Sequence, residues 1–581
     1  MVFTLAMIWL LALFFPLLMA ALIPLIRPRH ATIGAMLVAA ALPTLVISLI
    51  GQQEEGLAFP YLFLGTVIAL DGTRAVLLFF TSLLWLLAGW FAGSYQAKDP
   101  FRVRFDVFFL LSMTGNFGLI LAADIVSFYG FFVLMTFASF GLVVHTWTAE
   151  AIRAGHVYLV LAVIGEVLLL ASIFLAVAEA GSILVEDLGP AVAEAPHRNT
   201  IIALALAGFG VKAGVVPLYF WLPLAHPVAP TPASAVLSGA MIKAGLVGWV
   251  HIVPLGIVDL PVWGHLVVVL GLLATFGAVV GGLGQTNPKT ILAYSSISQI
   301  GLMTIVVGLG LGSAFAWQVG LPVLLFLALN HSLAKGALFL GTGVFVHAGR
   351  FRGWVIAGLA VAALAIAGFP LTGGAQAKYG ILEVVAHAQG FWGVWLPWLL
   401  SLSSLATTLL LLRFLRVLYR DNPPHSPGTF RGEVVPWGIL VGAVAGVPTL
   451  AIWLFGLPLP EMTISLKTLW GGFWPIGLAV LIYVLAHARK FWRSWEGRIP
   501  PGDFIVFFER IAHRILSYRP DRLIGKWESD VLNIARLADR IMAFEDAKKG
   551  VDKVERAMGS WSVVGFLFLA TVLWFIFFVA F

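Results

Sequence analysis

The sequence predicts an all-α protein that crosses a membrane about 14 to 16 times. Of its 581 residues, 60% are hydrophobic and only 11% are charged, whereas soluble globular proteins carry roughly 45–50% apolar and 25% charged residues. Apolar runs close to the length of about 20 residues that a helix needs to cross the hydrocarbon recur along the chain. The composition therefore argues against a soluble enzyme and favours one large membrane domain.

These runs indicate about sixteen candidate spans. The candidate spans are 3–26, 31–50, 73–95, 107–123, 125–146, 156–178, 200–222, 233–255, 263–284, 290–311, 320–347, 354–387, 390–418, 436–457, 471–488 and 560–581. The first run lacks the basic start and the small-residue cleavage site of a signal peptide, so we expect it to be retained as a helix.

Basic and acidic loops alternate between the spans. Loops after odd-numbered spans carry basic residues such as Lys98, Arg153 and Lys289, whereas loops after even-numbered spans carry acids such as Glu54 and Glu186. Because cytoplasmic loops carry the excess of basic residues, we expect a multi-pass protein of a prokaryotic inner (plasma) membrane with its N-terminus outside the cytoplasm. An even number of spans places the C-terminus outside as well, and an odd number places it inside.

Residues 489–558 break the apolar pattern because charged residues are frequent there. Trp527, Val531 and Ile534 recur at helical spacing between the charges. This spacing predicts an amphipathic helix on the cytoplasmic side, ahead of a terminal transmembrane helix at 559–581. Such a helix could dock against partner subunits or rest at the lipid interface, and the sequence leaves both open.

Ionisable residues lie inside several central spans, where a charge costs about 2.5–3.5 kcal/mol on an insertion scale. They are Glu166, Lys212, Lys243, His331, Lys335 and Lys378. A lysine held away from water can bind and release a proton near neutral pH, so a row of lysines can pass protons without a metal or a redox group. Any one of them could instead be structural, by donating to backbone carbonyls or by extending to the interface.

Two of these spans contain helix breakers next to a lysine. Lys212 precedes Pro217 and further prolines, and Lys378 follows Pro370 and Gly373. Freed backbone groups in a membrane are tolerated only beside protein or a wet cavity. We therefore expect two inverted five-helix repeats, spans 4–8 and 9–13, each with a broken helix, as in many ion transporters. A simple packing kink is the alternative.

The sequence contains no cysteine, which excludes disulfides, thiolate zinc sites and iron–sulfur clusters. The glycine-rich stretches near Gly208 and Gly308 lie inside apolar spans with no preceding strand, so they do not predict phosphate loops. We expect no cofactor, no metal site and no catalytic site in this chain, and no nucleic-acid partner.

Four stretches of the sequence carry a resemblance to a known family. They are 208-GFGVKAGVVPLYFWLPLAHPVAPTPASAVLSGAMIKAG-245, 287-NPKTILAYSSISQIG-301, 329-LNHSLAKGALFLGTG-343 and 368-GFPLTGGAQAK-378. Over residues 70–420 the chain resembles the antiporter-like subunits shared by respiratory complex I, Mrp-type sodium/proton antiporters and membrane-bound hydrogenases, in particular the Mrp D-type and hydrogenase-4 B-type subunits.

The resemblance implies a role for each buried ionisable residue. It implies that Lys212 is the pumping lysine of the first half-channel and that Lys378 is the terminal lysine of the second. It also implies that Lys243 connects the two halves and that His331 and Lys335 form the central relay. His226 would be the histidine after the broken helix.

The chain also departs from the family pattern. The family usually has a glutamate in the fifth span, where Phe132 and Val133 stand here, and Leu224 and Asn287 replace two aspartates. Glu166, one helix later, matches an acidic position that some members use. We therefore expect Glu166 to be the ion-pair partner of Lys212.

The resemblance implies a proton-translocating subunit of a multisubunit ion-pumping complex, whose partners are other membrane subunits and the lipid bilayer. The energy must come from elsewhere: electron transfer in a quinone oxidoreductase or hydrogenase partner, or a sodium gradient. A sodium/proton antiporter subunit, a proton-driven partner of an inorganic-carbon uptake complex and a non-conducting scaffold are the alternatives.

The expected regions follow from these features. They are N-terminal transmembrane helices at 1–106, a first antiporter-like repeat at 107–255, a second at 263–418, additional transmembrane helices at 436–488, the amphipathic segment at 489–558 and the terminal helix at 559–581.

Overall fold

The computed structural model describes residues 2–26, 30–50, 53–60, 65–388, 390–421, 430–460, 462, 465–489 and 491–502. The chain forms two compact units. The first comprises Met1–Ala20 and Pro28–Gly502, and the second comprises Ala21–Arg27 and Asp503–Phe581. Within the second unit the description is limited to residues 21–26, the end of the first helix. The amphipathic helix and the terminal helix expected beyond residue 502 lie outside the described residues.

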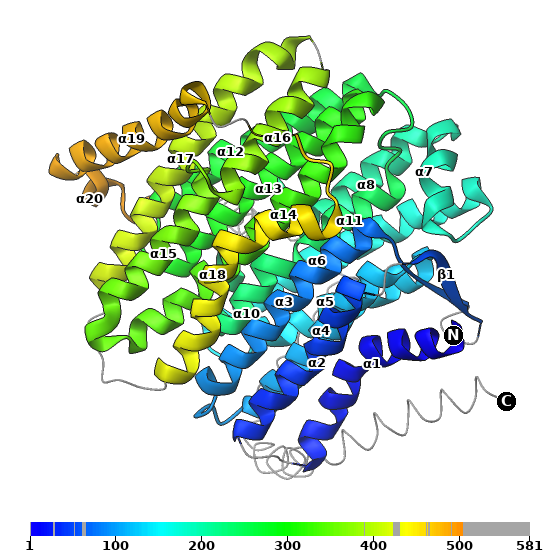
Figure 1. Ribbon diagram of the computed structural model, residues 1–581, viewed down its shortest axis with the longest axis horizontal. Coiled ribbons are helices and arrows are strands. Elements are labelled where there is room, and N and C mark those ends of the chain that lie inside the picture. The colour runs from blue at the N-terminus through cyan, green and yellow to red at the C-terminus, as the bar shows by residue number, and fades with distance from the viewer. Residues whose placement is uncertain are drawn as a thin grey trace, which may run out of the picture. The chain divides into compact units, whose positions relative to one another are not determined.

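The chain begins with two helices and a short hairpin (Figure 1). These elements are α1 (Val2–Ile26), α2 (His30–Ile50), β1 (Gln53–Phe59), β2 (Thr66–Leu70) and α3 (Gly72–Tyr95). The strands are antiparallel, with Leu57 opposite Ile68. This hairpin was not anticipated from the sequence, because two strands of seven and five residues leave little periodicity to detect.

A group of five membrane crossings follows. It contains α4 (Arg102–Leu121), α5 (Ile125–Val143), the long α6 (Ala149–Ala180), the short α7 (Val185–Glu194), the broken pair α8 (Arg198–Ala213) and α9 (Trp221–Val228), and a crossing made of α10 (Thr231–Val236), the π-helix η1 (Leu237–Met241) and α11 (Lys243–Ile252).

The same order then occurs a second time. This group contains α12 (Pro261–Leu283), α13 (Pro288–Gly312), the long α14 (Ala314–His347), the 3-10 turn η2 (Gly349–Phe351), the broken pair α15 (Arg352–Ala367) and α16 (Gly373–Ala388), and α17 (Phe391–Asp421). In each group the third helix is the longest and the fourth is interrupted. Because five crossings are an odd number, the second group runs in the opposite direction to the first.

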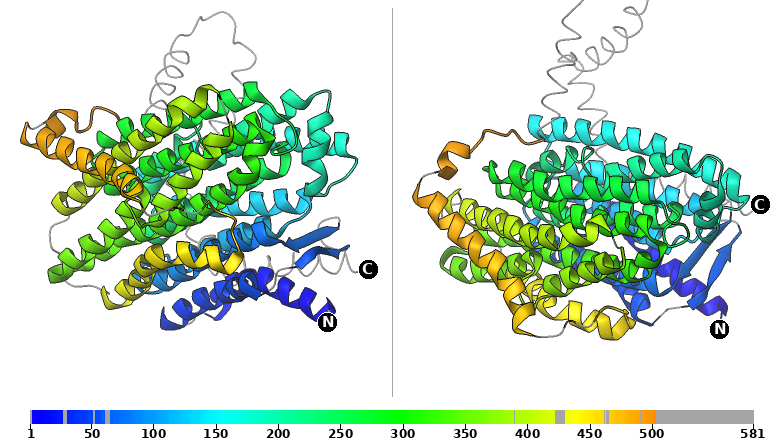
Figure 2. Two further views of the ribbon diagram at one scale, coloured as in Figure 1. Left: turned by 45° about the horizontal axis from the view of Figure 1, so that its top comes forward. Right: turned by 90° about the horizontal axis from the view of Figure 1, so that it is seen from above.

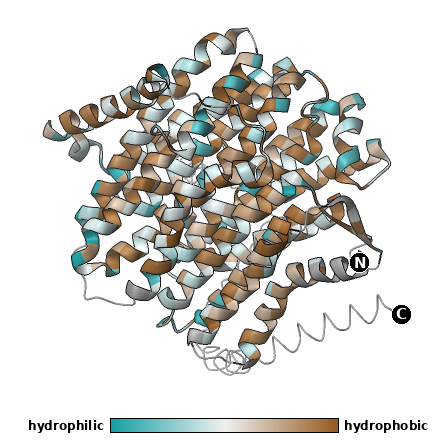
Figure 3. Cartoon of the chain, in the orientation of Figure 1, coloured by the Kyte–Doolittle hydropathy of each residue, from teal (hydrophilic) through white to brown (hydrophobic). Residues whose placement is uncertain are grey.

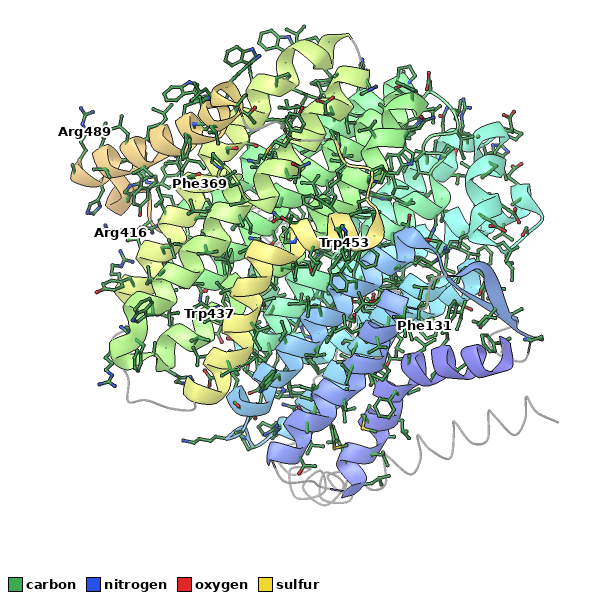
Figure 4. All side chains as sticks on the ribbon, viewed as in Figure 1. Phe131, Phe369, Arg416, Trp437, Trp453 and Arg489 are labelled. Carbon is green, nitrogen blue, oxygen red and sulfur yellow. The ribbon has the colours of Figure 1, made fainter. Side chains whose placement is uncertain are left out.

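The described chain ends with α18 (Phe430–Phe455), α19 (Leu466–Ala488) and the short α20 (Phe491–Trp495). Trp437 of α18, labelled in Figure 4, donates from its indole nitrogen to the carbonyl of Ala337 in α14 at 2.9 Å. This contact fixes α18 against the longest helix of the second group.

Thirteen helices in the described part of the chain are long and apolar enough to cross a membrane, so the predicted all-α multi-pass membrane fold is confirmed. About sixteen spans were expected. The difference has three sources: the span at 200–222 is broken, the span in α1 is described in full only over Ala12–Leu25, and the last span lies outside the described residues.

Local sequence determines where many helices begin and end. Side chains of Asp124, Thr148 and Ser313 accept backbone N–H groups at the starts of α5, α6 and α14, which satisfies donors that have no partner within a helix. Gly214 and Gly368 adopt positive φ angles of 75° and 83° at the ends of α8 and α15, a conformation that glycine adopts without a steric penalty.

The most deeply buried helices are α13 and α14, which lie in the middle of the first unit (Figures 1 and 2) and are buried along almost their entire length. Hydrophobic residues dominate these helices, and most hydrophilic residues lie near helix ends (Figure 3). The ionisable side chains described next are exceptions to this distribution.

Candidate functional site: a buried row of lysine and histidine

Lys212 lies in the last turn of α8, just before the break. Its side chain is 5% exposed, and its ammonium donates to the hydroxyls of Tyr158 at 3.0 Å and Thr136 at 3.3 Å. The α6 and α8 helices approach closely here, because Gly165 and Gly208 face each other without side chains. The Lys212 ammonium therefore reaches hydroxyls on both α5 and α6.

Local contacts hold the break after Lys212. The N–H groups of Gly214 and Val215 both donate to the carbonyl of Gly210. The indole of Trp221, on the far side of the break, donates to the carbonyl of Val211 at 2.8 Å. These contacts satisfy two carbonyl groups and two N–H groups at the interruption. They leave a lysine at the negative end of the helix dipole, which favours a cation.

Glu166 lies on α6, two turns after Tyr158, and lines the same small cavity as Lys212. Its side chain is 7% exposed, and neither carboxylate oxygen accepts a hydrogen bond from the described residues. The structure thus brings Glu166 and Lys212 together around one cavity. It does not join them directly, because no ion pair within 4.0 Å links them, and hydroxyl groups hold the ammonium instead.

Phe132, the residue before the Val133 position at which a glutamate was expected, presents its ring to Lys212. The Lys212 nitrogen lies 5.9 Å from the centre of the Phe132 ring and 5.5 Å from that of Tyr158. An aromatic face attracts a cation more weakly than a carboxylate does, and desolvation strengthens the attraction. The electrostatic partners of Lys212 are therefore two rings, two hydroxyls and the more distant Glu166.

Lys243 occupies the centre of the row, directly after the π-helix η1. Its ammonium nitrogen lies 2.9 Å from the carbonyl oxygen of Ser238, 2.6 Å from that of Gly239 and 2.7 Å from Nδ1 of His331. Both carbonyls belong to η1, whose wider winding weakens the normal helical pairing. Lys243 therefore joins the end of the first helix group to α14 of the second.

Lys335 lies one helical turn after His331 on α14, on the same face. It is completely buried and donates to the carbonyl of Leu292 in α13 at 3.0 Å. Nε2 of His331, the nitrogen that does not contact Lys243, has no hydrogen-bond partner among the described residues. The predicted central group of Lys243, His331 and Lys335 is thus assembled in one place.

His226 lies on α9, after the break. Its ring stacks on Phe339 of α14, with 4.6 Å between the ring centres, and both of its nitrogens lack hydrogen-bond partners among the described residues. Phe339 lies one turn after Lys335, so His226 extends the row along the face of α14.

Lys378 lies on α16, after the second break. Its ammonium donates to the carbonyl of Ala367, the last residue of α15, at 3.0 Å and to the hydroxyls of Ser404 at 2.5 Å and Ser403 at 3.4 Å. Lys378 thus places its charge at the C-terminal end of a broken helix, as Lys212 does in the first group. Unlike Lys212, it is only half-buried.

Several polar groups around these lysines were not anticipated from the sequence. The Tyr158 hydroxyl lies 2.6 Å from that of Ser139 and donates to the carbonyl of Thr136. Lys289, which was expected only as a loop charge, donates to the carbonyl of Ala229 at 2.8 Å, next to the α9–α10 connection. Single hydroxyls in apolar helices are common and carry no signal in the sequence. Their role becomes visible only when the structure places a lysine of a neighbouring helix beside them.

A hydrogen bond outside the spans ties two turns together at the basic ends of the helices. Nε2 of His145, after α5, lies 2.6 Å from a carboxylate oxygen of Asp99, after α3. Burial lowers the pKa of His145 below its ordinary value, although Asp99 acts in the opposite direction. Among the described residues, no group of three or more histidine, aspartate or glutamate side chains is arranged to hold a metal ion.

Comparison with known proteins identifies the family of this region. Residues 122–404 match the family model described as "NADH:quinone oxidoreductase/Mrp antiporter, TM". This part of the chain belongs to that family. The match includes both helix groups from α5 onward and every buried lysine of the row, and it confirms the resemblance inferred from the sequence motifs.

Relatives and solved structures agree with this assignment. The chain is 31% identical over 300 residues to hydrogenase-4 component B of Escherichia coli, and the aligned stretch covers 49% of this chain and 44% of the relative. It is 26% identical over 334 residues to the D-type Na(+)/H(+) antiporter subunit of Alkalihalophilus pseudofirmus, covering 55% of this chain and 66% of the relative. The chain therefore spans less than half of the first relative and about two thirds of the second.

Two solved structures share the fold. The Mrp complex from Dietzia sp. aligns with a TM-score of 0.71 at 22% identity, over 93% of this chain and 63% of that chain. The membrane-bound sulfane sulfur reductase, an archaeal respiratory membrane complex, aligns with a TM-score of 0.64 at 21% identity, over 82% of this chain and 98% of that chain. At these identities the likeness is one of fold.

Proposed function

We propose that this chain is an antiporter-like, ion-translocating subunit of a multisubunit membrane complex and that it moves protons along its buried row. The observation that carries the proposal is the contact between Lys243 and His331, which joins the two helix groups at 2.7 Å. Two titratable nitrogens at hydrogen-bond distance can exchange a proton directly. Lys335, one turn further, extends the exchange along α14.

The lack of fixed counter-ions supports a transient charge on this row. Within the described residues, no carboxylate lies within 4.0 Å of the ammonium of Lys212, Lys243 or Lys335. A buried ammonium without a counter-ion is expensive. A lysine that is charged only while it carries a proton incurs this cost only for that time.

The proposed order of transfer follows the helix groups. Protons load at Lys212, where Glu166 lines the same cavity, pass through Lys243, His331 and Lys335, and leave at Lys378. Each approach of Glu166 to Lys212 would favour the charged amine, and each separation would favour release of the proton. His226 completes the row between the broken helix and α14.

The partners are proposed from the relatives. The fold neighbours are chains of membrane complexes by their printed descriptions, which supports assembly of this chain with other membrane subunits in the bilayer. The chain holds no redox or nucleotide motif, so a partner or an ion gradient must supply the energy. Relatives named as Na(+)/H(+) antiporter subunits make sodium the second candidate ion.

A non-conducting scaffold is the second candidate function. Val133 and Leu224 stand where the family usually carries acids, and the described contacts of Lys212 include hydroxyls and rings in place of a paired carboxylate. A chain that has lost its acidic switch could keep the fold and its place in a complex without conducting ions.

The regions and the orientation inferred from the sequence remain part of the proposal. The repeats at 107–255 and 263–418 would form the conducting part, with the N-terminus outside the cytoplasm of a prokaryotic inner membrane. The loops that carry Lys98, Arg153 and Lys289 would then face the cytoplasm.

Replacing Lys335 with alanine tests the proposed function. Lys335→Ala should abolish ion transport by the reconstituted complex while leaving assembly near normal, because it removes a proton-carrying group from the middle of the row. Lys467→Ala, which removes an exposed lysine on α19, is the matched control and should transport normally. Normal transport by Lys335→Ala would leave only a structural role for this lysine and favour the scaffold.

A further inference from the structure

A large cavity opens among the helix ends next to the hairpin and reaches the row. It has a volume of about 690 Å³, and its lining includes Val67 of β2, Glu186 of α7, Leu246 of α11 and Leu325 of α14. Lys243 also lines it. We call the helix ends that carry the hairpin and α7 the hairpin side, and this space the hairpin-side cavity.

A second cavity lies among the opposite helix ends. It has a volume of about 520 Å³, and its lining includes Lys98, Thr231, Lys289, Thr342 and His347. These residues follow α3, begin α10 and α13, and end α14, so all of them lie on the side opposite the hairpin. We call these helix ends the basic side and this space the basic-side cavity.

One face of α14 connects the two cavities. Leu321, Leu325 and Ala328 line the hairpin-side cavity, and Thr342 and Val346 line the basic-side cavity. His331, Lys335 and Phe339 follow between these two sets at steps of three or four residues, and this spacing keeps all eight residues on one helix face. From Leu321 to Val346 the stripe is about 37 Å long, compared with about 30 Å for the hydrocarbon core of a bilayer.

The stretch of this stripe between the cavities consists largely of titratable groups. Lys243, itself in the hairpin-side cavity, contacts His331 at 2.7 Å. Lys335 follows after one turn, and the stacked pair of His226 and Phe339 stands before the basic-side cavity. His226 immediately precedes Pro227, which lines the basic-side cavity.

We propose that the central row exchanges protons directly with water on the hairpin side through the hairpin-side cavity, so that a proton can cross the membrane along α14 without passing Lys378. This inference rests on the proposed function, since it adds a second way out for the same row. The groups along the route are Lys243, His331 and Lys335, with the pair of His226 and Phe339 as the barrier toward the basic side.

The opening of the hairpin-side cavity fits water and small hydrated cations. Asp71 and Glu186 line it together with Arg74, which forms an ion pair with Asp71 and donates to the carbonyl of Ala122 at 3.3 Å. Two carboxylates against one guanidinium leave a net negative opening, which attracts cations and repels anions. The deeper walls, such as Leu246 and Leu325, are apolar and would confine water to a narrow column.

Cysteine accessibility tests the route, and the natural chain has no cysteine to replace first. Ala328→Cys places a thiol in the cavity wall one turn before His331, and Ala334→Cys places one on the same helix away from both cavities. Both alanines are at most 2% exposed. A charged, membrane-impermeant trimethylammonium methanethiosulfonate is added from one side at a time to the intact complex in vesicles, and labelling is followed by mass.

We expect Ala328→Cys to react from the hairpin side about 100-fold faster than Ala334→Cys, because only a hydrated thiol ionises and reacts readily. Thr342→Cys, in the basic-side cavity, should react only from the basic side. The trimethylammonium group attached at residue 328 should then close this exit and lower transport, and it should abolish the transport that remains in the double variant Ala328→Cys with Lys378→Ala. Equal, slow labelling of Ala328→Cys and Ala334→Cys would overturn the route.

Two further outcomes would also overturn it. Labelling of Ala328→Cys by an uncharged maleimide alone would show a cavity filled by lipid, and rapid labelling that leaves transport by the double variant with Lys378→Ala unchanged would show a cavity that is not on the path. Labelling does not require transport. If Lys335→Ala transports normally while Ala328→Cys still labels from the hairpin side, the proposed function fails and the access cavity stands.

Discussion

At the scale of single residues, Lys212 is held by hydroxyls beside aromatic rings, and α5 contributes no acidic side chain to its environment. The hydroxyls of Tyr158 and Thr136 accept from the ammonium, and the Phe132 ring lies 5.9 Å away. Hydrogen bonds to a charged group contribute about 1.5–3 kcal/mol each. These contacts hold the lysine in place, and in the proposed function Glu166 acts as its movable counter-charge.

We predict that Glu166 and Lys212 act as a unit. Glu166→Gln should remove transport about as fully as Lys212→Ala, and the double variant should be no worse than either single variant. Glu179→Gln, which alters an exposed acid on the same helix, is the control and should transport normally. Ion flux by the reconstituted complex measures the effect. Additive losses, or full transport by Glu166→Gln, would show that the two residues act independently.

The lysines of this site could be predicted from the sequence, but their neighbours could not. A lysine inside an apolar run is visible because its charge contrasts with its neighbours, so Lys212, Lys243, Lys335 and Lys378 could all be found. The direct ion pair of Glu166 with Lys212 was expected, and the two share a cavity without that contact. The role of Tyr158 could not be seen, since it depends on how α6 packs against α8.

At the scale of helices, the contact of α12 with α13 depends on glycine. Gly264 and Gly271 of α12 face Gly312 and Gly301 of α13, and a Cβ atom at residue 271 would lie 2.7 Å from the carbonyl oxygen of Gly301. The backbones approach so closely only because no side chain separates them. This contact places α13, with Leu292 as the acceptor for Lys335, within the core.

We predict opposite effects for two glycine substitutions on α12. Gly271→Ala should destabilise the protein by about 1–3 kcal/mol because the added methyl group forces the helices apart. Gly277→Ala, where a Cβ atom would meet no neighbour within 4 Å, should be neutral or stabilising by up to about 1 kcal/mol. Thermal unfolding of the purified protein in detergent compares the two. Equal unfolding temperatures would contradict this account of the packing.

Most helices could be predicted from the sequence, and their interruptions could be predicted in part. The breaks near Lys212 and Lys378 were visible from proline and glycine, and they lie at residues 214–220 and 368–372. The π-helix before Lys243 was not visible, because Leu237–Met241 reads as an ordinary apolar helix. The hairpin and α7 lie in the connections between spans, where short elements are held mainly by tertiary contacts such as those of β2 and Leu184 with residues 122–124.

At the scale of the whole molecule, the alternating loop charges predict the orientation in the membrane. Glu150 begins α6 on the basic side and Glu194 ends α7 on the hairpin side, and both are exposed. In intact cells, an impermeant thiol reagent should label Glu194→Cys and leave Glu150→Cys unlabelled until the cells are opened. The reverse pattern would show the opposite orientation in the membrane, so that each cavity would open to the other side.

In the proposed function, protons pass through the contact between the two helix groups. Proton flux driven by an imposed pH gradient, followed with a dye inside proteoliposomes that contain the complete complex, tests it most directly. Lys243→Met keeps the length of the side chain and removes the ammonium that contacts His331 at 2.7 Å. We predict that this variant assembles normally and loses proton flux, whereas flux at the wild-type rate in Lys243→Met would contradict the account.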